Sequence, residues 1–459
     1  MTKDEVRNLI RKQREFFESG TTHKVEFRLA ALRRLRQFIY KYENELNKAL
    51  KEDLNKCGFE SYMCETGLLL SEITYMEKHL KKFARDKKVI TPLSQFHSVS
   101  YKKPSPYGVV LVMSPWNYPV LLTLEPLVDA IAAGNTVILK PSAYSKKTSE
   151  VLSKLIKECF NEKYVAVVTG GRQENKALLE ERFDYIFFTG SKNVGRYVMK
   201  MAADKLTPVT LELGGKSPCI VDKDADIRLA AKRIVFGKFI NCGQTCVAPD
   251  FVYCSRSIKD RLVKEIKRQI VKQYGRQPLL NDSYGKIINT KHFERVSGLI
   301  DYSKVVYGGE TDALTCRIEP TIMDNVTFAD KIMTEEIFGP VLPILTFDNI
   351  DEVIKNIRVM EHPLALYIFT ENKYTADRVT SALGFGGGCI NDTLIHLATS
   401  EMPFGGFGES GMGSYHGKSG FDTFTHYKSI VDKKTWIDLP VRYQPYKNKY
   451  IDLLRQLLK

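Results

Sequence analysis

Long apolar runs are missing from this 459-residue sequence, and their absence argues against an integral membrane protein. No window approaches the ~18 consecutive apolar residues that a membrane-spanning helix needs. The first 14 residues mix charged side chains with Val6, Leu9 and Ile10 and lack the apolar core of a secretory signal. This mixture is typical of an amphipathic surface helix. We therefore expect a cytoplasmic protein without stable membrane insertion.

Paired cysteines and clustered histidines are scarce as well. The nine cysteines are scattered and odd in number, which argues against a disulfide framework. Cys242 and Cys246 lie four positions apart, but neither a second pair nor nearby histidines complete a structural zinc site. We therefore predict free thiols, most of them small buried groups, and no bound metal.

Acidic residues are outnumbered, since 68 Lys and Arg face 54 Asp and Glu and give a formal charge of +14. A basic balance suits nucleic acid or an acidic membrane surface as partner. The dense basic segments 78–88 and 261–272, however, carry apolar residues at helical spacing, which favours solvated helix faces. We therefore predict no nucleic-acid partner.

Short apolar runs separated by helical segments organise most of the chain. Residues 1–83 are predicted as helices, and residues 89–103 have the alternation of an extended arm. Runs typical of buried parallel strands then follow at 108–113, 135–139, 164–168, 185–188, 217–221 and 250–253. This order predicts an α/β fold of two doubly wound α/β domains, the second beginning after Gly214.

The C-terminal part has a different pattern. Glycine is dense between residues 384 and 417, which predicts loops instead of a third core. Residues 450–458 have the spacing of a short amphipathic helix.

Three segments carry residues that suit covalent catalysis. Cys246 stands in a loop of small polar residues where a substrate can reach a thiol, although a lone cysteine is more often structural. Glu212 ends an apparent strand between two leucines, where desolvation raises the pKa of a carboxyl and makes it a usable base. Capping a helix or pairing with Lys216 are alternative roles for Glu212.

Asn117 belongs to the segment Ser114-Pro-Trp-Asn-Tyr-Pro119, directly after a buried strand. Two prolines restrict this turn and direct the asparagine from the carboxyl end of the strand, where α/β proteins place their sites. Its amide is able to donate to a developing oxyanion. An asparagine that only satisfies the turn is the alternative.

Taken in order, these segments resemble the aldehyde dehydrogenase family over almost the whole chain. The motifs that carry the resemblance are PWNYP at 115–119, LKPS at 139–142, FTGS at 188–191, LELGGKSP at 211–218, GQTC at 243–246, EEIFGPV at 335–341 and PFGG at 403–406. The segment from Ser410 to His426 is similar to class 3, the branch that includes fatty and aromatic aldehyde enzymes.

The resemblance implies a mechanism. The Cys246 thiolate attacks the aldehyde, and the Asn117 amide with the Cys246 N–H holds the oxyanion. A hydride then passes to NAD or NADP, and Glu212 activates water to hydrolyse the thioester. A dehydrogenase that passes the acyl group to CoA, and a binding protein that keeps the fold without turnover, are the alternatives. Glu212 argues against the first, and the joint presence of the three residues argues against the second.

Cofactor contacts follow from the same resemblance. Gly190 and Gly195 form G-x4-G instead of the usual dinucleotide loop, and the resemblance places this turn against the cofactor phosphates. The full set implied is Lys140, Ser142, Gly190, Ser191, Gly195, Glu336 and Phe338. Many members carry glutamate where this chain has Ala143, so a 2′-phosphate meets no carboxylate there. We predict that NADP is accepted, alone or beside NAD.

The implied substrate contacts are Tyr62, Tyr118, Leu122, Phe236 and Thr245, a mostly apolar and aromatic set. They favour medium- or long-chain aliphatic, aromatic or terpenoid aldehydes over charged semialdehydes. The implied domains are a cofactor-binding domain of residues 1–83 and 106–212 and a catalytic domain of residues 213–410. A small β oligomerisation arm of residues 84–105 and 411–435 and a tail of residues 436–459 complete the division, and the arm implies a homodimer.

Overall fold

A six-stranded sheet forms the first half of the computed structural model, which describes residues 1–438 and 440–458. Its strands run in the order β17–β7–β6–β3–β4–β5, and all neighbours are parallel except β17 with β7. The strands are β3 (Val109–Met113), β4 (Thr136–Lys140), β5 (Val165–Val167), β6 (Tyr185–Thr189), β7 (Val209–Glu212) and β17 (Gly411–Met412). Because β3 lies between β4 and β6, the chain reverses its direction of winding at β3. The predicted doubly wound arrangement is therefore present.

Helices cover both faces of this sheet. One face packs against α2 (Val25–Leu54), α4 (Gly67–Phe83), α5 (Leu121–Ala133) and α6 (Lys146–Cys159), and the other against α1 (Lys3–Glu18), α7 (Arg172–Glu180) and α8 (Lys192–Ala203). The alternation of β3 explains both layers, since Val110 and Val112 face the first set while Leu111 and Met113 face the second. The short helices α3 (Gly58–Ser61) and α14 (Gly417–Thr423) flank α4.

A seven-stranded sheet forms the second half, in the order β10–β13–β14–β9–β8–β15–β16. The strands are β8 (Pro218–Val221), β9 (Phe251–Ser255), β10 (Val305–Tyr307), β13 (Thr321–Met323), β14 (Val341–Phe347), β15 (Ala365–Phe369) and β16 (Gly387–Ile390). Only β10 with β13 is antiparallel. One face carries α9 (Ile227–Phe239) and α10 (Lys259–Tyr274), whose apolar residues join the same core as α2, α4, α5 and α6. The other carries α11 (Thr290–Ser297), α12 (Ile350–Arg358) and α13 (Lys373–Ala382).

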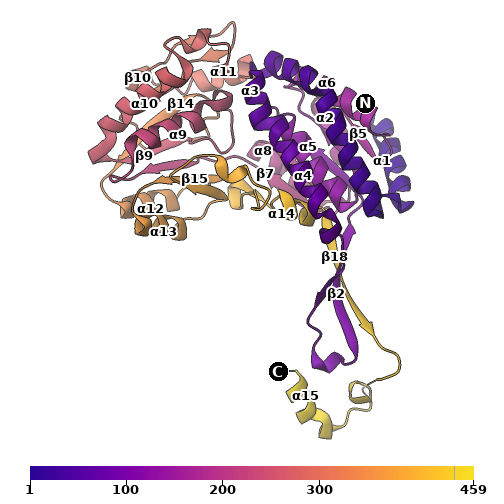
Figure 1. Ribbon diagram of the computed structural model, residues 1–459. Helices are drawn as coiled ribbons and strands as arrows, with labels where there is room; N and C mark the ends of the chain where they lie inside the picture. Colours follow the sequence, from indigo (N-terminus) through magenta and orange to yellow (C-terminus); the bar gives the residue numbers. More distant parts are fainter. Residues whose placement is uncertain (439, 459) are drawn as a thin grey trace.

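A three-stranded antiparallel sheet leaves the body of the molecule as an arm (Figure 1). It consists of β1 (Lys87–Val89), β2 (Ser98–Pro106) and β18 (Thr425–Lys433), and β2 pairs with β18 along its whole length. The C-terminal helix α15 (Ile451–Leu457) lies near the end of this arm, where it contacts the turn Leu93–Gln95. Ile90 and Trp436 are 94% and 69% exposed there, so the arm leaves large apolar side chains uncovered in the single chain.

The sequence predictions agree with these elements in type and, within a few residues, in position. Two details differ. The helical region 1–83 is interrupted by a left-handed residue at Gly20 and by a π-helical turn over Tyr62–Thr66. The glycine-rich region 384–417 contributes the edge strand β16 as well as loops, because backbone pairing with β15 needs no side chains. In the described ranges, no helix has the length and apolarity needed to cross a membrane, and all nine cysteines carry free thiols.

Candidate active site

The predicted catalytic residues meet at the carboxyl ends of three neighbouring strands of the first sheet. Asn117 follows β3, Gly190 and Ser191 follow β6, and Glu212 is the last residue of β7. Open α/β sheets bind ligands at the point where the direction of winding reverses, which here lies between β3 and β6. A cavity of about 670 Å³ opens at this edge and is lined by Asn117, Glu212 and Cys246 among other residues.

Cys246 approaches this cavity from the second half of the chain, on the loop between α9 and β9. The loop turns sharply at Asn241 and Cys242, whose φ angles of 49° and 54° are left-handed. Buried hydrogen bonds fix it, since the Asn241 N–H donates to the Glu60 carboxylate at 2.9 Å. The Gln244 amide donates to the Lys286 carbonyl at 2.9 Å, and its oxygen accepts from the Ile288 N–H at 3.0 Å. The nucleophile therefore stands on a loop that other segments hold in place.

The thiol of Cys246 is partly buried beside the carboxyls of Glu336 and Glu212. Burial, together with the negative charges of Glu336 and Glu212, raises its pKa to about 12. Glu336 itself has its pKa raised to about 8 by burial and by Asp250. These surroundings favour the neutral thiol over the thiolate.

Asn117 hydrogen-bonds to the loop that carries Cys246 through both its side-chain amide and its backbone carbonyl. Its Nδ2 donates to the carbonyl of Gln244 at 3.0 Å, and its own carbonyl accepts from Asn241 Nδ2 at 2.8 Å. Lys56 Nζ donates to the same carbonyl at 2.8 Å. The amide of Asn117 carries two hydrogens, so one remains available on the side of the cavity.

Glu212 is the most isolated polar group of the site. Its side chain is 2% exposed, and neither carboxyl oxygen has a hydrogen-bond partner in the described residues. Burial therefore raises the pKa of this carboxyl well above its usual range. A methyl group at Gly405, in the PFGG motif, would stand only 3.0 Å from Glu212 Oε1, so a glycine leaves room for the carboxyl. The alternative pairing with Lys216 does not occur, because Lys216 Nζ binds Asp250 at 2.6 Å.

The predicted cofactor residues separate into two groups. Gly190, Ser191, Glu336 and Phe338 line the cavity together with the predicted catalytic residues, and Ser191 is the residue directly before α8. Gly195, Lys140 and Ser142 lie outside this lining. Gly195 instead allows α8 to pack closely on β7, since a methyl there would approach Leu213 to 2.7 Å.

Lys140 has an internal role in this arrangement. Its Nζ donates to the carbonyls of Pro141 and Gly170 at 3.0 and 2.7 Å, and burial lowers its pKa to about 8. Ser142 is partly exposed beside it, at the carboxyl end of β4.

Of the predicted substrate residues, only Leu122 lines the cavity. Tyr118 and Thr245 bind each other through their hydroxyls at 2.6 Å, which ties the segment after β3 to the residue before Cys246. Tyr62 lies on the π-helical turn with half of its side chain exposed, and Phe236 packs against the main core from α9. Four of the five substrate residues named from the sequence therefore lie outside the lining of this cavity.

Four cations on the cavity wall were missed by the sequence prediction: Lys192, Arg196, Lys216 and Arg295. Three of them have carboxylate partners, namely Glu361, Asp250 and Glu335. Arg295 also donates to the Ile337 carbonyl at 2.6 Å, and Lys216 donates to the Glu335 carbonyl at 3.0 Å. Both therefore hold the loop that carries Glu336 and Phe338. Lys216 belongs to the LELGGKSP motif, which is the one signal that pointed to it.

A buried ion pair behind Asn117 was missed as well. Lys56 and Glu65 are both fully buried and lie 2.6 Å apart. The Glu65 carboxylate accepts from the N–H groups of Val120 and Leu121 at 2.7 and 3.3 Å, where α5 begins. Removing either partner would leave an unpaired buried charge, so we expect this pair to fix the start of α5 and the carbonyl of Asn117.

Two doubly wound halves bring a thiol, a buried carboxyl and an amide to one cavity, an arrangement typical of α/β enzymes. The pattern of the aldehyde dehydrogenase family matches residues 1–430, and the chain belongs to that family. Its oxidation of aldehydes with NAD or NADP follows from this membership and from the relatives described below.

Relatives of known name match this chain over nearly their full length. The 4,4′-diaponeurosporen-aldehyde dehydrogenase of Staphylococcus aureus (strain NCTC 8325 / PS 47) is 47% identical, over 95% of this chain and 95% of its own. The dimeric NADP-preferring aldehyde dehydrogenase of Canis lupus familiaris is 43% identical, over 96% of this chain and 98% of its own. Among solved structures, the substrate-bound state of Staphylococcus aureus AldH superposes with a TM-score of 0.97 at 45% identity and covers 99% of each chain. Aldehyde dehydrogenase family 3 member B1 of Rattus norvegicus is 42% identical, over 98% of this chain and 97% of its own, which confirms the predicted class 3 resemblance.

Proposed function

We propose that Cys246, Asn117 and Glu212 oxidise an aldehyde to the acid through a covalent thioester that water hydrolyses. Cys246 Sγ forms a bond to the aldehyde carbon, and its proton leaves to a base. The developing oxyanion accepts hydrogen bonds from the free hydrogen of the Asn117 amide and from the Cys246 N–H. After the hydride has left the carbon, a water attacks the thioester while Glu212 takes one of its protons. The acid departs and the Cys246 sulfur is released.

The isolation of Glu212 is the observation that carries this proposal. A carboxyl that is 2% exposed and without a hydrogen-bond partner is costly to bury, and such a group is kept where its proton affinity is useful. It lines the same cavity as Cys246 and Asn117. A dehydrogenase that passes its acyl group to CoA needs no such base, so the hydrolytic reaction is favoured.

The nicotinamide cofactor fits the same cavity. The beginning of α8 faces it with Ser191 and with Arg196, which forms no ion pair in the described residues, and this arrangement suits phosphate groups. Glu336 Oε1 is buried there without a partner, and it is free to accept from a ribose hydroxyl. When bound, the cofactor accepts the hydride of the aldehyde. We propose that Ala143, exposed near Lys140, tolerates the 2′-phosphate of NADP.

For the substrate we propose apolar aldehydes, with Leu122, Trp116, Met333 and Phe338 as the apolar part of the wall. The name of the Staphylococcus relative specifies 4,4′-diaponeurosporen-aldehyde, which makes terpenoid aldehydes the first compounds to compare with aliphatic and aromatic ones. The cations on the wall have carboxylate partners in three of four cases, so little charge is left for a semialdehyde. Turnover restricted to charged semialdehydes would contradict this proposal.

The domain boundaries, a cytoplasmic location and the homodimer are further proposals. The chain forms one sheet before and another after residue 213, apart from β17, which supports a domain boundary near that residue. The name of the Canis lupus familiaris relative, a dimeric enzyme, supports the homodimer. The uncovered apolar side chains of the arm suit a contact with a second copy.

The variants Glu212→Gln and Cys246→Ala test the mechanism. With aldehyde and cofactor, Glu212→Gln should release one equivalent of reduced cofactor in a burst and then stop, because the thioester forms but is not hydrolysed. Cys246→Ala should show neither burst nor turnover. Steady turnover by Glu212→Gln, or stimulation of the unmodified protein by CoA, would contradict the hydrolytic reaction.

A further inference from the structure

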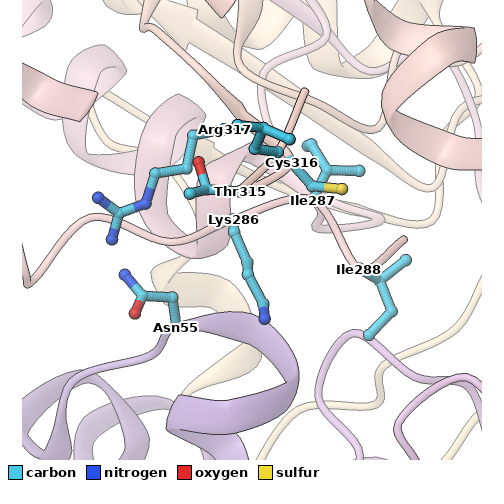
Figure 2. Close-up of a pocket in the computed structure, with 8 residues that line it drawn as sticks. Asn55, Lys286, Ile287, Ile288, Thr315, Cys316 and Arg317 are labelled. Atoms are coloured by element: carbon cyan, nitrogen blue, oxygen red, sulfur yellow. The ribbon is translucent and has the colours of Figure 1, made fainter. Parts of the chain in front are cut away.

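A second cavity, of about 440 Å³, is lined in part by Lys286 and Ile288, which hydrogen-bond to Gln244 on the loop that carries Cys246 (Figure 2). Its walls come from three separate segments: Asn55 at the end of α2, the loop 286–288, and residues 314–317 between β11 (Thr311–Asp312) and β12 (Arg317–Ile318). Figure 2 shows the side chains of Lys286 and Arg317 extending from two of these segments toward Asn55. A volume of this size accommodates a small organic molecule.

The charge of this cavity has one sign. Its lining contains Lys286 and Arg317 and no carboxylate, and neither cation has an ion-pair partner in the described residues. Lys286 Nζ donates one of its three hydrogens to the Glu52 carbonyl at 2.7 Å, and the Arg317 guanidinium donates one hydrogen to the Leu279 carbonyl. Asp312, the cross-strand neighbour of Arg317, is engaged by its own turn. Several charged donors therefore remain available.

The wall of the cavity is also the support of the catalytic loop. The carbonyl of Lys286 and the N–H of Ile288 hold the Gln244 side chain at 2.9 and 3.0 Å, and the Gln244 carbonyl accepts from Asn117. From the opposite side, the Ile287 N–H donates to the carbonyl of Cys316 at 2.9 Å. A displacement of residues 286–288 is thus passed through two hydrogen bonds to the amide that faces the substrate.

We propose that this cavity binds a small organic anion carrying carboxylate or phosphate groups, and that its occupation changes the activity of the aldehyde site. Paired oxyanion oxygens match the planar donors of Arg317, and the Lys286 ammonium adds a point charge. A cleft lined by one sign of charge concentrates the opposite one. Binding of an anion draws Lys286 and Arg317 toward each other, and Lys286 carries the loop that holds Gln244.

Alkylation of Cys316 measures occupation directly, because this thiol is partly exposed in the wall. Citrate and inorganic phosphate serve as probes, with chloride at matched ionic strength as reference and peptide mass spectrometry as readout. A saturable, several-fold slowing of Cys316 alkylation is expected, while Cys57 reacts at an unchanged rate. Protection by citrate alone assigns a carboxylate ligand, and protection by phosphate alone assigns a phosphate ligand. Protection by neither, or equally by chloride, would overturn the proposal.

Arg317→Gln and Lys286→Gln should abolish the protection, whereas Lys264→Gln, which removes an exposed lysine of α10, should leave it intact. With saturating cofactor, the protecting anion should also change kcat/KM for the aldehyde in the unmodified protein and in Lys264→Gln, but not in Arg317→Gln. Protection that survives both cavity substitutions refutes the site, and protection without any change in kcat/KM refutes its coupling to Gln244.

Discussion

Replacement of Asn117 by alanine separates the oxyanion role of its amide from its structural role. Of the two amide hydrogens, one binds the Gln244 carbonyl at 3.0 Å, and the other faces the cavity. Loss of one oxyanion donor typically lowers kcat by about 10²–10³, or about 3–4 kcal/mol of barrier. The structural cost is smaller, since the Gln244 carbonyl keeps its bond from Asn241 Nδ2 at 3.1 Å and Lys56 binds the unaltered backbone of residue 117. We expect about 1 kcal/mol of lost stability.

The assay compares kcat from cofactor absorbance with the free energy of unfolding from urea titration. Asn193→Ala is the matched control, because Asn193 also lines the cavity but its amide oxygen only accepts from Arg196 at 3.3 Å. The control should retain near-normal kcat and stability. If Asn117→Ala keeps kcat within a few-fold of the unmodified protein, the oxyanion assignment is wrong. If its stability falls by several kcal/mol instead, Asn117 acts by holding the loop.

Three further predictions concern Glu212, Ala143 and Asp129. Because burial raises the pKa of Glu212 and the base must be ionised to act, kcat should rise with pH through a value above the ordinary glutamate range; a profile already flat at mildly acidic pH would contradict this. Ala143→Glu should lower kcat/KM for NADP by about tenfold while sparing NAD, and no NADP turnover by the unmodified protein would refute the reasoning. Asp129 is fully buried beside the carboxyls of Glu72 and Glu125, and burial, followed by the charges of these two neighbours, raises its pKa well above the usual range. The folded state therefore keeps a proton that the unfolded state releases, so stability falls as pH rises from the ordinary aspartate pKa through the raised one. Asp129→Asn should reduce this loss in urea titrations at mildly acidic and mildly alkaline pH, whereas the exposed Asp204→Asn should not; equal loss in both variants would contradict the account.

The sheets were predictable because their signal is local. The run 109–113 is apolar at every position and the run 136–140 at its three central positions, which is typical of strands covered on both faces, and the structure buries all of both strands. The position of Glu212 at the end of a strand was readable for the same reason. The edge strand Gly387–Ile390 was not, since it is half-exposed and contains two glycines. Its position is decided by the backbone pairing that β15 offers.

Residues that position the site residues could not be predicted, because the groups they contact are distant in sequence. Lys56 and Glu65 stand nine positions apart, which is not the three- or four-residue spacing of ion pairs on one helix face, so no local pattern pairs them. Only the fold shows that both are dry and that they hold the Asn117 carbonyl and the start of α5. Lys216 illustrates the converse. From sequence its amine was an equally good partner for Glu212, and its choice of Asp250, 34 positions later, is what leaves Glu212 unpaired. The basicity of Glu212 therefore depends on where a neighbouring lysine is held, and moving that lysine would weaken the base without touching it.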